Sequence, residues 1–265
     1  MSPSPDPLAP AAAVFEGVGV ALLTLFTDDG ELDVAATAEH AARLVDLGVR
    51  AVVVAGTSGE APALSADERV ALLEGVRAVV PPSAAVVIAG TGGPSARQAV
   101  AYTRDAVAAG ADAVAALSPP GAPDPRPYYE RVAEAAGTTP VLAYHFPAVS
   151  PPGIPLPMLA ELPVSGCKDS SGDPDRLLET LSTWPRPLYV GTSALLALAG
   201  PLGCAGAILA LANAEPERCA AAFAGDAKAQ LALAEAHRES LVPFPAGIKR
   251  LTARRFNTST VTRMG

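Results

Sequence analysis

Lysine is the scarcest charged residue in this chain. Of the 19 basic side chains among 265 residues, 16 are arginine, and only Lys168, Lys228 and Lys249 carry an amine. A lysine amine can lose its proton and attack a carbonyl carbon, whereas a guanidinium stays protonated. Lys168 ends an apolar run, while the other two lysines lie in polar, helix-like segments and are expected to be solvated. Lys168 is therefore either a nucleophile or half of a structural ion pair with Asp169 or Asp173.

Cysteine is also rare, which bears on redox chemistry and metal binding. Cys167, Cys204 and Cys219 are odd in number and form no CxxC pair, so we expect reduced thiols in a cytoplasmic protein. No His, Cys and Asp residues recur at metal-ligand spacing, and we expect neither a metal nor another cofactor. No apolar run reaches the roughly 18–20 residues of a membrane-spanning helix.

Charge is sparse and mostly negative. Charged residues make up 17% of the chain and the net charge is −8, which argues against nucleic acid or an anionic membrane as a partner. The one basic cluster, residues 249–255, is interpreted as a solvated helix face. His40 and His237 are expected on helix surfaces. Residues 1–13 are rich in Pro and Ala without a basic segment, which predicts a disordered arm rather than a signal peptide.

Half of the residues are hydrophobic, and their order along the chain predicts the fold. From residue 15 onward, eight short apolar runs alternate with amphipathic segments. The runs are continuous rather than alternating, as in parallel strands buried on both faces. They span residues 18–26, 50–56, 85–90, 113–117, 140–145, 164–168, 188–191 and 204–209.

Eight strand–helix units predict an α/β fold, a (β/α)8 TIM barrel, over residues 14–224. Residues 225–265 are expected to form a short C-terminal helical extension. The rival is a doubly wound open sheet that binds a dinucleotide. It is disfavoured because Thr24-Leu25-Phe26-Thr27 stands where the glycine fingerprint would follow the first strand.

Polar groups end several of these strands, and a barrel gathers strand ends around one mouth. Lys168 there could form a Schiff base with a ketone, because an apolar surrounding disfavours its ammonium form. Tyr144 is a candidate acid/base for the proton transfers. Thr57 and Ser58, in a turn flanked by glycine, could hydrogen-bond a carboxylate. Small residues at 206–208 would leave room for a substrate.

At these positions the sequence resembles the dihydrodipicolinate synthase / N-acetylneuraminate lyase family of Schiff-base-forming class I aldolases. The matching motifs occur in order over about residues 15–250, nearly the whole chain, and the one around the lysine is specific. They are Gly56-Thr57-Ser58-Gly59-Glu60, Gly90-Thr91-Gly92, Tyr144-His145-Phe146-Pro147, Gly166-Cys167-Lys168-Asp169-Ser170-Ser171-Gly172-Asp173 and Gly206-Ala207-Ile208.

The resemblance implies a role for each matching residue. Lys168 would form the imine with pyruvate or another 2-oxo acid, Tyr144 would relay protons together with Thr57, and Ser58 would bind the substrate carboxylate. We also assign three residues to substrate binding: Gly56, Gly206 and Ile208. The implied partners are a small 2-oxo acid and an aldehyde, and the implied assembly is a homo-oligomer, either a dimer or a tetramer.

Two departures from the family pattern bear on the substrate. Gly121 stands where dihydrodipicolinate synthases place a tyrosine that crosses a subunit interface, and the next tyrosines are Tyr128 and Tyr129. Val149 stands where they place an arginine that grips the carboxylate of the second substrate. His145 replaces the usual Asn and is given no role. The leading interpretation is an aldolase or lyase that uses a less acidic aldehyde. The alternatives are dihydrodipicolinate synthase itself, an imine-dependent dehydratase of a deoxy-oxo sugar acid, or a non-catalytic relative that binds 2-oxo acids.

Overall fold

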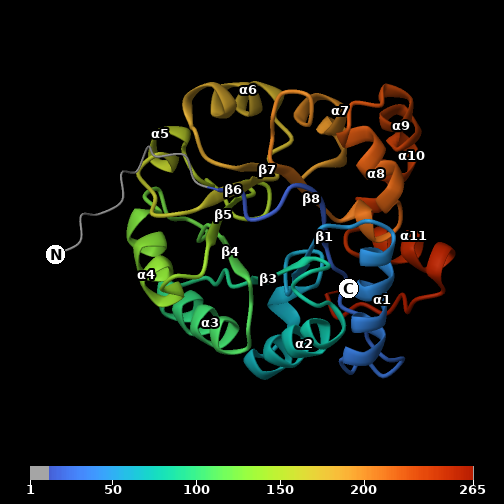
Figure 1. Ribbon diagram of the computed structural model, residues 1–265. Coiled ribbons are helices and arrows are strands. Elements are labelled where there is room, and N and C mark those ends of the chain that lie inside the picture. Colours follow the sequence, from blue (N-terminus) through green and yellow to red (C-terminus); the bar gives the residue numbers. More distant parts are fainter. Residues whose placement is uncertain (1–11, 265) are drawn as a thin grey trace.

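Eight parallel strands close into a barrel in the order of the sequence, with β1 (Gly17–Ala21) paired to both β2 (Ala51–Val54) and β8 (Gly206–Leu209). The computed structural model describes residues 12–264, and its helices surround the barrel (Figure 1). The predicted TIM barrel is confirmed. The predicted N-terminal arm, apart from its last two residues, lies outside the described part of the chain.

The remaining strands and the helices follow the predicted order. The strands are β3 (Val86–Gly90), β4 (Ala113–Leu117), β5 (Val141–His145), β6 (Gly166–Asp169) and β7 (Leu188–Val190). The barrel helices are α1 (Val34–Asp46), α2 (Ala66–Val79), α3 (Ala96–Ala108), α4 (Arg126–Ala136), α5 (Leu156–Leu159), α6 (Pro174–Thr183), α7 (Leu196–Ala199) and α8 (Pro216–Phe223). Short 3-10 turns are η1 (Ala61–Ala63), η2 (Ser193–Leu195) and η3 (Leu211–Asn213).

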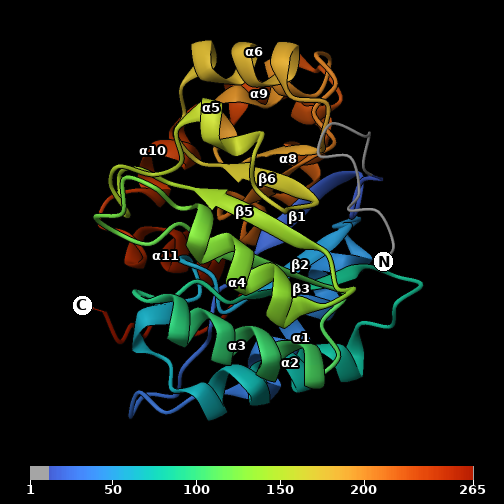
Figure 2. The ribbon, with the colours of Figure 1, turned by 90° about the vertical axis from the view of Figure 1, so that its left-hand side faces the viewer.

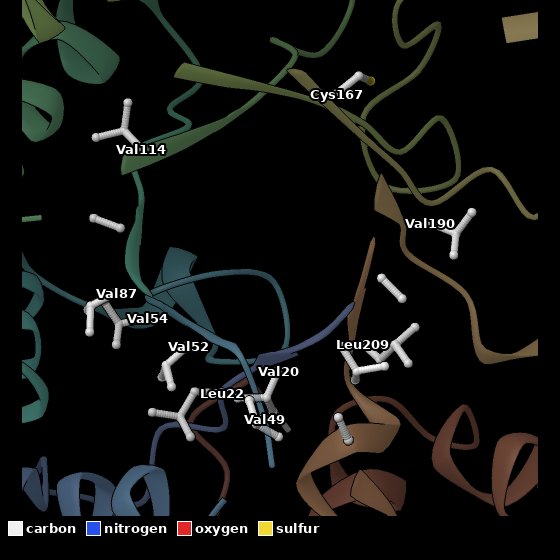
Figure 3. Packing of buried hydrophobic residues seen from close by; sticks show 14 of the residues in the cluster. Val20, Leu22, Val49, Val52, Val54, Val87, Val114, Cys167, Val190 and Leu209 are labelled. Carbon is white, nitrogen blue, oxygen red and sulfur yellow. The ribbon is translucent and has the colours of Figure 1, made fainter. Parts of the chain in front are cut away.

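Apolar side chains cover both faces of the strands, as the continuous runs predict. Those on the outer face form one large buried cluster beneath the helices, part of which is shown in Figure 3. Those on the inner face, among them Val53, Ile88, Leu142 and Ile208, fill the barrel interior. Because side chains alternate along a strand, inner positions two residues apart stack toward the C-terminal end. Tyr144 therefore follows Leu142 on the inner face.

The N-terminal end of the barrel is closed by an aromatic pair. The rings of Phe15 and Tyr189 stack with their centroids 4.7 Å apart. The Tyr189 hydroxyl accepts a hydrogen bond from the backbone N–H of Val14 (2.9 Å) and donates one to the Phe15 carbonyl oxygen (3.1 Å). The barrel interior is thus closed at this end, so it can be reached only from the opposite end.

Strand β1 ends five residues earlier than the apolar pattern predicts. Asn213 is the reason: its side-chain oxygen accepts a hydrogen bond from the Leu23 N–H (3.1 Å), and its amide donates to the Ala21 carbonyl oxygen (2.8 Å). The side chain therefore takes the place of a neighbouring strand, and the chain turns away from the sheet after residue 21.

The C-terminal segment continues as helices α9 (Ala227–Ala232), α10 (Ala234–Ser240) and α11 (Ala246–Phe256), which confirms that helix follows the barrel. Figure 2 shows α10 and α11 at the end of the barrel toward which the strands run. Phe256 of α11 packs against His40 of α1, with ring centroids 5.5 Å apart. None of the helices within residues 12–264 is long and apolar enough to cross a membrane.

Candidate active site

A cavity of about 370 Å³ opens at the C-terminal ends of the strands. It brings together five of the seven residues that the sequence assigns to the site. These are Lys168 on β6, Tyr144 on β5, Ile208 on β8, and Thr57 and Ser58 in the turn after β2. Residues separated by up to 151 positions in the chain thus share one enclosed space.

The other two assigned residues, both glycines, lie elsewhere. Gly56 lines a neighbouring cavity of about 430 Å³, which shares Thr57, Tyr144 and Val149 with the first. Gly206 lies one inner layer below Ile208, where an added Cβ would collide with the backbone of β1 and touch the Tyr189 ring. The lack of a side chain at 206 therefore serves packing of the barrel interior, and the structure does not bring this residue to the cavity.

Lys168 is 5% exposed, and its position on β6 explains why no nearby carboxylate reaches it. Adjacent strand residues face opposite sides, so Asp169 faces outward and pairs with Arg176 of α6, with Oδ2 2.7 Å from Nε. Asp173 caps α6 by accepting hydrogen bonds from its first backbone amides. Within residues 12–264 no carboxylate forms an ion pair with Lys168, and both proposed structural partners are engaged elsewhere.

Tyr144 lies beside the lysine on the adjacent strand. The amine nitrogen of Lys168 is 4.0 Å from the centroid of the Tyr144 ring. The Tyr144 hydroxyl is 3.5 Å from Oγ1 of Thr57, at the outer limit of hydrogen-bond distance. An amine, a phenol and a hydroxyl therefore follow one another across the cavity wall, in an order suited to proton transfer.

Sequence reasoning missed the residue that fixes this end of β5. Tyr129 of α4 is fully buried, and its hydroxyl donates to the Ala116 carbonyl oxygen of β4 (2.8 Å) while accepting from the Tyr144 N–H (3.3 Å). It thus links β4 to β5 beside Tyr144. Tyr128 instead accepts a hydrogen bond from the Gly93 N–H (3.1 Å). Neither phenol lines either cavity, so neither fills the position of the family's interface tyrosine within this chain.

The turn that carries Thr57 and Ser58 is anchored through Glu60. This side chain is fully buried, and its backbone has the left-handed value φ = 56°, which is uncommon for a residue with a Cβ. Its Oε2 accepts hydrogen bonds from the backbone N–H groups of Arg263 and Met264, both at 2.8 Å. The last described residues of the chain therefore hold the turn that carries Thr57 and Ser58 in place.

Lys249 completes that anchor, which corrects the expectation that it is solvated. Its amine lies 2.6 Å from Oε1 of Glu60, and both side chains have 0% exposure. The amine also donates to the Val261 carbonyl oxygen (2.5 Å) and lies 4.4 Å from the centroid of the Phe26 ring. Burial lowers the pKa of Lys249, against the opposing effect of Glu60. The basic cluster 249–255 is thus only partly a surface face, because its first residue points inward.

The outer part of the 370 Å³ cavity is formed by α10 and the loop after it, which the sequence did not assign to the site. His237 is half-buried there rather than on a free surface, and burial lowers its pKa. Its Nδ1 is 2.8 Å from Oγ of Ser193, which follows β7. Leu241 and Phe244 line the same region. The only sequence signal for this rim was its position after the eighth strand.

The other two histidines are buried. His40 on α1 is 1% exposed, against expectation, and burial lowers its pKa to about 4. His145 follows Tyr144 on β5, and burial likewise lowers its pKa to about 4. Its Nδ1 accepts a hydrogen bond from the Ile154 N–H (2.8 Å), so its role is to hold the loop between β5 and α5. In the described part of the chain no three His, Cys, Asp or Glu side chains are grouped so as to hold a metal.

Comparison with known proteins gives the chain its family. Residues 14–262 match the model of the dihydrodipicolinate synthetase family. An uncharacterised DapA-like lyase of Halobacterium salinarum is 35% identical over 260 residues, which cover 93% of this chain and 82% of the relative. A 4-hydroxy-tetrahydrodipicolinate synthase of Synechococcus sp. (strain WH7803) is 31% identical over 253 residues, covering 92% and 82%.

The fold agrees with these matches. The crystal structure of YagE, an E. coli K12 prophage protein of the dihydrodipicolinic acid synthase family in complex with pyruvate, superposes with a TM-score of 0.87 at 27% identity. The match covers 94% of this chain and 92% of YagE. Family model, curated relatives and solved structure all extend over nearly the whole chain. This protein therefore belongs to the dihydrodipicolinate synthetase family.

Proposed function

We propose that this protein is a class I aldolase that binds pyruvate or another 2-oxo acid as an imine on Lys168 and makes or breaks a carbon–carbon bond to an aldehyde. The observation that carries the proposal is a buried lysine with no carboxylate partner among residues 12–264, placed in a cavity beside a phenol and a hydroxyl. The complex of the related YagE with pyruvate supports the choice of a 2-oxo acid.

The chemistry follows from the positions of these groups. The neutral amine attacks the ketone carbon, and loss of water gives the iminium. A proton then leaves the neighbouring carbon, and the enamine so formed attacks the aldehyde carbon. The new carbon–carbon bond leaves an alkoxide that takes up a proton, and water releases the product from the lysine. Cleavage runs through the same steps in reverse.

The remaining groups of the cavity take the other roles. Tyr144 is the acid/base for these proton transfers, with Thr57 as its relay partner 3.5 Å away. Ser58 is 5% exposed, lines the cavity beside Thr57, and is assigned to the substrate carboxylate. Ile208 forms part of the apolar wall that keeps water from the imine.

Borohydride trapping tests the proposal. The protein is incubated with pyruvate, reduced, and analysed by intact mass and peptide mapping. The adduct should be on Lys168, and Lys168→Arg should abolish both trapping and turnover. Lys228→Arg, at an exposed lysine on α9, is the matched control and should retain both. An adduct mapped to another lysine, or normal turnover by Lys168→Arg, would contradict the proposal.

Product analysis separates the related activities. An aldolase releases two fragments from its adduct, whereas a dehydratase of a deoxy-oxo sugar acid releases only water. Imine formation without turnover of any candidate substrate would identify a binding protein. We further propose a cytoplasmic homo-oligomer, either a dimer or a tetramer, in which residues 225–265 extend the barrel. Sedimentation analysis measures that assembly directly.

A further inference from the structure

The mouth of the Lys168 cavity is rimmed by large apolar side chains in exposed positions. Val149 is 49% exposed, Leu241 is 53% exposed and Phe244 is 38% exposed, and all three line this cavity. Val149 comes from the loop after β5, whereas the other two come from the loop between α10 and α11. Exposed apolar groups that gather around one opening mark a binding surface more often than isolated ones do.

No arginine and no lysine other than Lys168 is among the described residues that line this cavity. Among the described residues that line the cavity, Lys168 is the only lysine, arginine, aspartate or glutamate, and its amine is used to form the imine. The arginines nearest the rim along the chain line neither cavity and donate to backbone oxygens: Arg238 to that of Ala234 and Arg250 to that of Val242. Arg176, the arginine nearest Lys168 in the sequence, donates to Asp169 and to the Ile154 carbonyl oxygen. In the neighbouring cavity, Arg69 donates to the carbonyl oxygens of Gly90 and Ala61. A second carboxylate in the mouth would lose water without gaining an ionic partner.

Hydroxyl groups on the opposite wall raise a second possibility, a sugar-like aldehyde. Most of these hydroxyls already form hydrogen bonds within the protein, so a polyhydroxylated ligand would have to compete for them. The engaged residues are Ser171, Thr192, Ser193 and Ser240. The surface around the opening that remains free to contact a ligand is therefore mainly the apolar rim.

We infer that the second substrate, given the imine chemistry proposed above, is an uncharged aldehyde with an apolar substituent that lies against Val149, Leu241 and Phe244. The aldehyde carbon faces the enamine on Lys168 at the floor, and the substituent points toward solvent along the rim. Burial of each additional methylene contributes about 0.8 kcal/mol, which corresponds to about a fourfold gain in kcat/KM.

A series of aldehydes tests this substrate class. With pyruvate saturating, kcat/KM is measured for acetaldehyde, propanal, butanal and pentanal by following aldehyde consumption. The value should rise along the series by up to about fourfold per methylene. The matched acid for butanal is 4-oxobutanoate, in which a carboxylate replaces the terminal methyl group. It should react at least roughly tenfold more slowly, because its charge finds no partner.

Substitutions in the rim provide a second test of the substrate class. Phe244→Arg places a cation at the mouth and should lower the butanal to 4-oxobutanoate preference by roughly tenfold. Leu231→Arg introduces the same cation on α9 at a side chain that is 76% exposed and lines neither cavity, and it should leave the preference unchanged. Both sites are exposed, so both variants should fold.

The possible outcomes are distinct. Pyruvate trapped on Lys168 together with a flat or falling aldehyde series, or a preference for 4-oxobutanoate, would overturn this inference and leave the imine proposal standing. Failure of trapping would overturn the imine proposal itself. If Phe244→Arg dissociates an oligomer and leaves the aldehyde preference unchanged, the rim is an interface between copies of the chain, and the inference is wrong.

Discussion

Two buried lysines with opposite surroundings define this molecule at the scale of single residues. Lys249 is buried with Glu60 against it and has a backbone carbonyl as a further acceptor. Lys168 is buried beside a phenol ring, with its neighbouring carboxylate turned outward by strand alternation. The presence or absence of a carboxylate partner therefore distinguishes the structural amine of Lys249 from the candidate nucleophile Lys168. Burial does not distinguish them, because both side chains are buried.

The Tyr144 hydroxyl should matter for turnover much more than for imine formation. If Tyr144 is the acid/base, as we propose, Tyr144→Phe should lower kcat by roughly 10²–10⁴-fold, the usual contribution of such a group. Borohydride trapping of pyruvate after long incubation should still yield the Lys168 adduct. Tyr128→Phe removes a phenol hydroxyl that lines neither cavity and is the matched control for kcat. Equal losses in both variants would show that Tyr144 acts only through packing.

Val149 should make aspartate semialdehyde a poor second substrate. A charge-assisted hydrogen bond to its carboxylate would contribute about 1.5–3 kcal/mol, and the apolar side chain at this mouth position supplies none. Val149→Arg should therefore raise kcat/KM for aspartate semialdehyde by about tenfold or more. Formation of the cyclised lysine precursor by the unaltered protein at a rate typical of a biosynthetic enzyme would contradict this expectation.

At the scale of elements, the turn after β2, helix α11 and the segment after it act as one unit through the Glu60–Lys249 pair. Glu60→Gln leaves the Lys249 charge buried and unpaired and should lower the free energy of unfolding by about 3–5 kcal/mol. The double variant Glu60→Gln/Lys249→Met should recover part of this loss. Urea denaturation measures both values.

A surface pair gives the control for this prediction. Glu239 and Arg254 pair with side-chain exposures of 32% and 59%, so Glu239→Gln should leave the free energy of unfolding nearly unchanged. If Glu60→Gln has an equally small effect, Glu60 does not anchor the substrate-binding turn.

The strands and helices were largely predictable, because a continuous apolar run indicates that a segment is buried even when the segments packed against it are unknown. The ends of β5 and β6 were predictable to within one residue, since the apolar runs end at residues 145 and 168 and the strands at His145 and Asp169. What sequence reasoning missed depends on contacts between distant positions. Lys249 meets Glu60 across 189 residues, and Asn213 ends β1 although it lies 190 residues from Leu23 along the chain. No local pattern of polarity contains these pairings, and the apolar rim of Val149, Leu241 and Phe244 was missed for the same reason.

For the molecule as a whole, the buried histidines should make stability depend on pH. Burial lowers the pKa of His40 and of His145 from 6.5 to about 4, so the folded protein keeps both rings neutral where the unfolded chain is already protonated. The free energy of unfolding should therefore fall as pH decreases from about 6.5 to about 4. Each histidine contributes up to about 3 kcal/mol of this loss.

Urea titrations between pH 7 and pH 4.5 would measure this dependence. His40→Gln removes one of the two groups, so its stability should change less steeply over the same range, even if the variant is less stable at pH 7. An identical slope for the variant and the unaltered protein would exclude His40 as a source of the pH dependence.

The stacked pair of Phe15 and Tyr189 at the base of the barrel has a kinetic consequence. Because the barrel is closed there, both substrates must enter and leave through the opening at the C-terminal ends of the strands. The 2-oxo acid, which would bind deepest, must therefore bind first and leave last. An aldehyde bound early would stand between the 2-oxo acid and its lysine and would act as an inhibitor. Condensation should accordingly follow a compulsory order, with inhibition by excess aldehyde that additional 2-oxo acid relieves.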